Sequence, residues 1–129
     1  MELFVDILKG LPNFYHLNGA TDDEIAKSEQ LLCVSFAPEY KAYVSAYGVA
    51  SANGHELTGI CTSQRLNVVN VTLSCRKQLP EADTLYVIEE ANIDGIVLWQ
   101  SATGEIYQSS SGKNLHKVCD SLREYITMN

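Results

Sequence analysis

The sequence lacks the positive charge of a nucleic-acid or membrane binder. Nine lysines and arginines stand against sixteen aspartates and glutamates, which gives a net charge of −7. Phosphate groups are bound by clustered basic side chains, so we expect no direct contact with nucleic acid or with an anionic membrane surface. The acidic balance instead favours a basic protein partner, although such a balance also serves solubility alone.

The sequence also lacks the motifs of an enzyme or a metal protein. It has no G-x-S-x-G nucleophile elbow, and its four cysteines form no C-x-x-C pair. Gly104 and Gly112 are too far apart for a phosphate loop, and Asn114 stands where a magnesium-binding Ser or Thr belongs. His116 and Cys119 have a ligand-like spacing, but no second pair completes a site. We therefore predict no catalysis, no metal and no cofactor.

No apolar run is long enough to span a membrane. The opening stretch MELFVDILKGL is interrupted by Asp6 and Lys9 and has no basic start, unlike a signal peptide. We expect a cytoplasmic protein whose scattered cysteines are reduced and buried. The 129 residues contain no repeat or linker, so residues 1–129 are expected to form a single domain.

The strongest local pattern that is present is FAPEYKAYVSAYG, residues 36–48. Pro38 suits the first position of a helix, and the tyrosines from Tyr40 to Tyr47 recur on one face of that helix. Gly48 then allows the helix to end. Because tyrosine rings bury well while their hydroxyls need partners, this helix is expected to pack on the core beside polar groups.

A second helix is predicted for residues 22–32, after a capping box formed by Thr21 and Glu24. Ile25 and Glu29 lie on its apolar stripe. A carboxylate at that position is either poised in a functional pocket or is a structural acid bonded to a tyrosine or a backbone amide. We favour the structural role, because half-buried carboxylates are more often simply paired.

The remaining segments predict an α+β fold. Helices are predicted for residues 2–8, 66–77 and 115–126, the last capped by Asn114; strands for residues 55–60, 84–89, 96–100 and 105–108; and loops for residues 10–19 and 49–53. The segment 66–74 is also rich in β-branched residues, so a strand is the alternative there. Trp99 lies in a run that is apolar on both faces and is expected in the core. Short Asp-Gly and Thr-Gly turns indicate an antiparallel meander. We expect a single domain with a central, largely antiparallel sheet flanked by helices.

The segment from Gly19 to Ile60 resembles the signature of the SUKH superfamily, Smi/Knr branch. The signature combines an acidic capped helix, an aromatic-x-Pro-x-x-Tyr start to the next helix, and a short Glu-aliphatic-x-Gly strand. The matching positions in this sequence are Ile25, Glu29, Phe36, Pro38, Tyr40, Tyr47, Gly48, Glu56, Leu57 and Gly59. The sequence departs from the family pattern at Cys33, where a glycine usually closes the helix, and at Ala37.

The resemblance implies a domain without catalytic activity. Bacterial members of the family look like immunity proteins that neutralise toxins, often nucleases, delivered between competing cells. A cognate basic toxin is then the expected partner of a monomer or weak homodimer. The alternative is a regulatory or scaffold protein, similar to fungal members linked to cell-wall synthesis. A third alternative, a small-molecule binder or an enzyme, is supported only by Glu29 and Glu56.

Two acidic clusters are candidates for the toxin interface. A third cluster, residues 22–24, is already explained by helix capping. The first candidates are Glu89, Glu90 and Asp94 at the tip of a predicted hairpin, followed by Glu81 and Asp83 in the preceding loop. The three residues at the tip are expected to project together without a basic neighbour, so that a basic toxin surface would offset their mutual repulsion.

Overall fold

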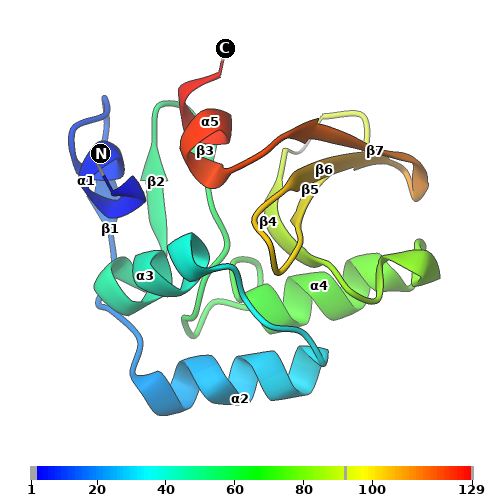
Figure 1. Ribbon diagram of the computed structural model, residues 1–129, viewed down its shortest axis with the longest axis horizontal. Helices are drawn as coiled ribbons and strands as arrows, with labels where there is room; N and C mark the ends of the chain where they lie inside the picture. Colours follow the sequence, from blue (N-terminus) through cyan, green and yellow to red (C-terminus); the bar gives the residue numbers. More distant parts are fainter. Residues whose placement is uncertain (1–2, 92, 129) are drawn as a thin grey trace.

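The computed structural model describes residues 3–91 and 93–128, and this part of the chain contains two antiparallel sheets among five α-helices (Figure 1). The helices are α1 (Phe4–Lys9), α2 (Asp22–Leu32), α3 (Pro38–Tyr47), α4 (Val68–Arg76) and α5 (Leu122–Thr127), with a short 3-10 helix η1 (Pro80–Ala82). The smaller sheet has the order β1-β2-β3, with β1 (Tyr15–His16), β2 (Ala50–Ala52) and β3 (His55–Glu56). The larger sheet has the order β4-β5-β6-β7, with β4 (Tyr86–Glu90), β5 (Ile96–Gln100), β6 (Ile106–Ser110) and β7 (Lys113–Cys119). The predicted α+β class and the antiparallel meander are confirmed, while the antiparallel strands are divided between two sheets.

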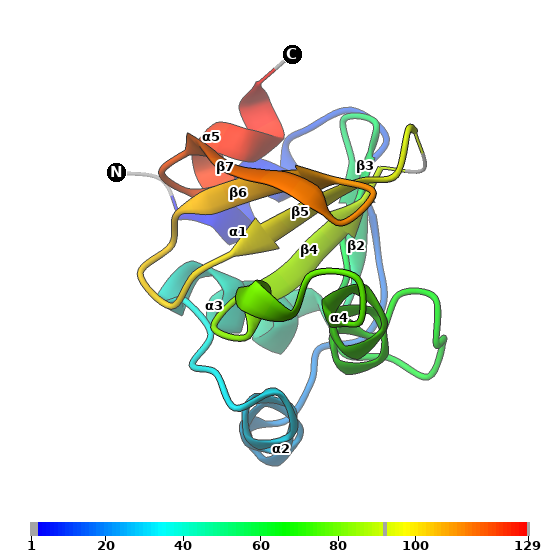
Figure 2. The same ribbon diagram turned by 90° about the vertical axis from the view of Figure 1, so that its right-hand side faces the viewer.

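The larger sheet is covered on both faces. Tyr86 and Ile88 of β4 pack into a core shared with α1, α2, α3 and α5, whereas Val87 faces a second cluster with α4 and η1. Successive side chains of a strand point to opposite faces, which explains this division. Both views show α2 at the bottom, below α3 and α4, and the sheet curving over α4 (Figures 1 and 2). Helices that are distant in sequence therefore enclose the meander.

The tyrosines of α3 join the two sheets, and each hydroxyl finds a partner as expected. Tyr40 and Tyr43 are fully buried. The Tyr43 hydroxyl donates to the Thr58 carbonyl (2.8 Å), and the Tyr40 hydroxyl lies 2.9 Å from the Thr58 Oγ1. That Oγ1 donates to the carbonyl of Val87 (2.7 Å), while the Thr58 amide donates to the carbonyl of Ile88 (2.8 Å). The segment after β3 is thus fixed to β4 by both backbone and side chain.

The helices with local sequence signals begin and end close to their predicted bounds. The capping box of α2 is present, with the Glu24 amide bonded to Thr21 Oγ1 and the Thr21 amide bonded to the Glu24 carboxylate. Cys33 ends α2 in the left-handed conformation (φ 55°), taking the place that a glycine usually has. The first helix begins at Phe4. The predicted start of that helix, Glu2, lies outside the described residues.

The C-terminal helix predicted from Leu115 to Ile126 is wrong. Residues Lys113–Cys119 form β7, which pairs with β6, and α5 begins only at Leu122 with Ser121 as its N-cap. Ser111 and Gly112 form the turn of this hairpin. The spacing of the apolar residues in this segment is compatible with a helix or with a strand. The strand forms because β6 offers an edge with which it can pair.

Two predicted loops contain strands of the smaller sheet. Ala50–Ala52, expected in a loop, is β2, and Tyr15–His16, expected in a connector, is β1. Alanine and serine favour strands weakly, so no local pattern signals β2. Ala50 and Ala52 are nevertheless buried within the main core. The strand predicted for residues 55–60 is shorter, with β3 limited to His55–Glu56.

Candidate binding groove

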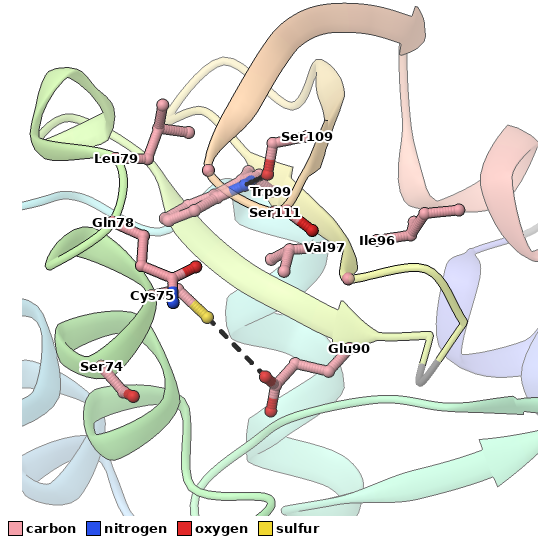
Figure 3. Close-up of a pocket in the computed structure, with 12 residues that line it drawn as sticks. Ser74, Cys75, Gln78, Leu79, Glu90, Ile96, Val97, Trp99, Ser109 and Ser111 are labelled. Atoms are coloured by element: carbon pink, nitrogen blue, oxygen red, sulfur yellow. Dashed lines mark hydrogen bonds between the residues drawn. The ribbon is translucent and has the colours of Figure 1, made fainter.

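A groove opens between α4 and the face of the larger sheet that curves over it (Figure 3). Its volume is about 450 Å³. The lining residues come from α4 and the turn after it, from β4, β5 and β6, and from the two hairpin turns; they are Ser74, Cys75, Gln78, Leu79, Glu90, Gly95, Ile96, Val97, Trp99, Ser109, Ser111 and Gly112. This volume falls within the range of sites that hold a small ligand or a side chain of a partner.

The floor of the groove is formed by Trp99. Its indole is buried (1% exposed) and packs with Leu79 and Val87, as expected for a core residue. The indole Nε1–H donates to the Ser109 Oγ at 3.0 Å. The bond fixes the indole against β6, so the floor is rigid.

Two glycines in the lining of the groove allow a close approach of neighbouring segments. A Cβ on Gly112 would lie 2.7 Å from the carbonyl oxygen of Gln78, and a Cβ on Gly95 would lie 2.4 Å from the Ser111 Oγ. Both glycines also have positive φ values (74° and 68°). The turn between β6 and β7 can therefore rest on the chain just after α4 only because residue 112 has no side chain.

The charge in the groove is negative. Among the described lining residues Glu90 is the only charged one, and its side chain is exposed. The Cys75 thiol lies 3.8 Å from the Glu90 Oε2. Burial, and then the Glu90 carboxylate, raise the pKa of Cys75 to about 12. The thiol is thus protonated at neutral pH and is a poor nucleophile.

The acidic residues predicted for the interface do not lie together. Glu90 lines the groove, and Asp94 directly precedes the lining residue Gly95; Glu81 and Asp83 are exposed in and after η1, which follows the lining residue Leu79. The expectation that Glu89 projects beside Glu90 is wrong, because Glu89 is only 6% exposed. Glu89 and Glu90 point to opposite faces of the sheet because they are consecutive in β4, and the register shift between Val87 and Glu89 leaves Glu89 facing the main core and Glu90 facing α4.

Glu89 is instead the acceptor of a buried cluster. Its Oε1 lies 2.9 Å from the His55 Nδ1 and accepts from the Tyr125 hydroxyl, while its Oε2 accepts from the Glu56 amide at 2.8 Å. Burial raises the pKa of Tyr125, and the negative Glu89 beside it raises that pKa further. One carboxylate thereby holds β3, β4 and α5 together.

Glu29 and Glu56, the two acids of the enzyme alternative, have separate structural partners. Glu29 accepts from the Phe36 amide (2.7 Å), so it bonds a backbone amide, as the structural role predicted. Glu56 binds Arg65 through both oxygens (2.6 and 3.1 Å), and these bonds lower the pKa of Glu56. The carboxylates thus serve different elements, and no shared site forms between them.

Replacing Glu29 by alanine is expected to lower the free energy of unfolding by about 1–3 kcal/mol, because the Phe36 amide loses a charged acceptor. Urea denaturation would measure the change. Lys41→Ala is the matched control, since the Lys41–Glu29 contact (3.5 Å) is half-exposed and is worth at most about 1 kcal/mol. Equal losses in the two variants would mean that the ion pair, rather than the amide bond, gives Glu29 its role.

The structure of residues 3–91 and 93–128 also bears on two other features, a metal site and a membrane-spanning helix. Within these residues no group of at least three His, Cys, Asp or Glu side chains is placed to hold a metal ion. His116 lies exposed on β7, and the buried Cys119 donates its thiol to the Ser121 carbonyl (3.5 Å). Among the described helices, none has the length and apolar character needed to cross a membrane.

Sequence reasoning missed the groove as a site. The available signals were the Asp94-Gly95 and Ser111-Gly112 turns, which bracket β5 and β6 and place two positive-φ glycines at the rim. Neither turn indicates that α4 lies opposite the sheet. Helix α4 packs against β4, and no local sequence pattern predicts this contact.

A comparison with protein-family models finds a family model that matches the chain over a range containing all the elements described above. This family, SUKH_5, is described as SMI1-KNR4 cell-wall and matches residues 1–128. A comparison with curated proteins finds no match.

Proposed function

The chain belongs to the SUKH_5 family of SMI1-KNR4 proteins, and on this premise we propose that it is an immunity protein that binds and neutralises a basic toxin. The observation that carries the proposal is the groove between α4 and the larger sheet, whose only charged residue among the described lining residues is Glu90 and whose lining residue Gly95 directly follows the exposed Asp94. A nuclease is basic where it grips phosphates, and an acidic protein that covers this surface excludes the nucleic acid. Neutralisation by contact requires no catalytic group, metal or cofactor.

Steering by surface charge is the first step of the proposed mechanism. The net charge of −7 attracts a basic toxin over a distance, so that association is fast and sensitive to salt. Glu81, Asp83, Glu90 and Asp94 are the exposed acids proposed to face the toxin. The buried Glu89 supports the fold and is not proposed to contact the toxin. The chain is proposed to act in the cytoplasm, as a monomer or a weak homodimer.

A regulatory or scaffold protein is the second candidate. The description of the matching family refers to the cell wall, which favours a role in cell-wall synthesis signalling. Such a role needs a docking surface but no toxin. The genes beside the one for this chain distinguish the two candidates, because an immunity protein is expected next to a toxin gene.

The immunity role is tested with the toxin domain encoded by the neighbouring gene. Co-expression of this chain is expected to restore growth of cells that produce the toxin, and the purified pair is expected to form a stable complex by calorimetry. A neighbourhood without a toxin gene, or a toxin that this chain neither binds nor blocks, would support the regulatory role instead.

Reversing Glu90 and Asp94 to lysine is expected to slow association with the toxin by about tenfold and to flatten its salt dependence, since steering acts on the on-rate. Stopped-flow measurements at several salt concentrations test this. The control reverses Asp23 and Glu124, two exposed acids that do not line the groove. It makes the same change in net charge, so an equal effect in both variants would place the interface elsewhere.

A further inference from the structure

We propose that the groove between α4 and the larger sheet takes up the guanidinium group of an arginine side chain from the partner. This inference rests on the proposed function for the identity of the partner as a basic protein. The residues of the groove themselves supply the acceptors and the negative charge for this binding, so free arginine derivatives can test it without the partner.

Hydrogen-bond acceptors lie along the groove. Figure 3 shows the side chains of Gln78 and Cys75 and the carboxylate of Glu90 around the same space. Within the described chain, the side chains of Gln78 and Ser111 form no hydrogen bond, and the Glu90 carboxylate is bonded only by the Cys75 thiol. A guanidinium group carries five N–H donors in a plane and can bond several such acceptors at once.

Arg65 leaves Glu90 available. Arg65 lies close enough for Glu90 to raise the pKa of its guanidinium, yet the larger cause is Glu56, which binds both terminal nitrogens of Arg65. No lysine or arginine lines the groove among the described residues. A cation that enters from outside thus meets a carboxylate without a competing positive charge in the groove.

The walls suit the hydrocarbon part of an arginine. Val97 is half-buried and packs with Trp99 on the sheet side, and Leu79 lies at the far end beside Trp99. Arginine buries its methylene groups along apolar surface while its charged end keeps polar contacts. Lysine has a comparable stem, but its ammonium group is compact and more strongly hydrated, so it would bond fewer of these acceptors.

The inference is tested by titrating the protein with N-acetyl-arginine amide and recording NMR spectra. Trp99 is the only tryptophan, so its indole N–H reports directly on the floor of the groove. We expect saturable shifts of the Trp99 indole and of the Ser111 and Gly112 amides. N-acetyl-citrulline amide, which has the same shape without the charge, is expected to cause none, and N-acetyl-lysine amide is expected to bind more weakly.

Glu90→Gln keeps the shape of the side chain and is expected to weaken arginine binding about tenfold or more, because a charged hydrogen-bond acceptor is lost. Asp23→Asn removes the same charge from an exposed position of α2 outside the groove and is expected to leave binding unchanged. The absence of saturable shifts at Trp99, or equal affinity in Glu90→Gln and the unchanged protein, would overturn the inference.

The outcome is separable from that of the proposed function. If arginine does not bind while the chain still protects cells from the toxin, the immunity role stands and the groove is not its contact. If arginine binds in the groove while no toxin is neutralised, the site stands and the immunity role fails.

Discussion

Replacing Glu89 by alanine is expected to lower the free energy of unfolding by about 3 kcal/mol or more, since removal of a buried charged acceptor leaves its partners unpaired. The His55 ring, the Glu56 amide and the Tyr125 hydroxyl all lose their bond to this carboxylate. The Tyr125 hydroxyl is largely enclosed and has no easy access to water in exchange. Urea denaturation followed by circular dichroism measures the loss.

The neighbouring residue provides the control. Glu90→Ala changes the same charge one position further along β4, but its side chain is exposed, and the stability is expected to change by no more than about 0.5 kcal/mol. If Glu89→Ala does not fold, Tyr125→Phe removes a single bond to Glu89 and is expected to cost about 1–3 kcal/mol. A Glu89→Ala variant as stable as Glu90→Ala would show that the cluster does not support the fold.

Replacing Gly59 by alanine is expected to cost at least about 3 kcal/mol, because the added methyl group would overlap a rigid part of the core. A Cβ on this residue would lie 1.8 Å from the carbonyl oxygen of Gly48. The backbone around it cannot easily move. The Gly59 amide donates to Leu66 (2.9 Å), its carbonyl accepts from Val68 (2.8 Å), and the following Ile60 amide donates to Gly48 (3.0 Å).

Gly10→Ala is the matched control for this substitution. A Cβ on Gly10 would have its nearest neighbour at 3.7 Å, and its φ of −88° suits any residue. We expect a change of at most about 0.5 kcal/mol for this exposed position. Thermal and urea unfolding of both variants provide the comparison. Similar stabilities for Gly59→Ala and the unchanged protein would mean that the segments around Gly48 and Gly59 can move apart without loss of stability.

These two predictions concern contacts that no local pattern indicates. Glu89 and Glu90 are adjacent and chemically identical, and the sequence suggested that both project from the hairpin tip. The register shift in β4 and the positions of His55 and Tyr125, which are 34 and 36 residues away, bury one carboxylate and expose the other. Likewise, the sequence places Gly59 only within a predicted strand, whereas its role is to let its backbone approach that of Gly48.

The strand β7 shows the same limit for secondary structure. Leu115, Val118 and Cys119 have a spacing that fits one face of a helix, and the helical assignment was wrong. Strand β7 forms because β6 offers an edge with which it can pair. Strand formation depends on a partner elsewhere in the chain, so short apolar segments remain ambiguous without that partner.

The sequence by itself determined the features whose causes lie within about one or two helical turns. These are α2 with its capping box, α3 with Pro38 at its start and Gly48 at its end, and the acidic balance of the whole chain. The tertiary structure alone decided which carboxylate is buried, which glycine is crowded, and that α4 faces the meander across a groove. The reason is physical: capping and periodicity act between near neighbours, whereas burial and cavities arise only when distant segments pack together.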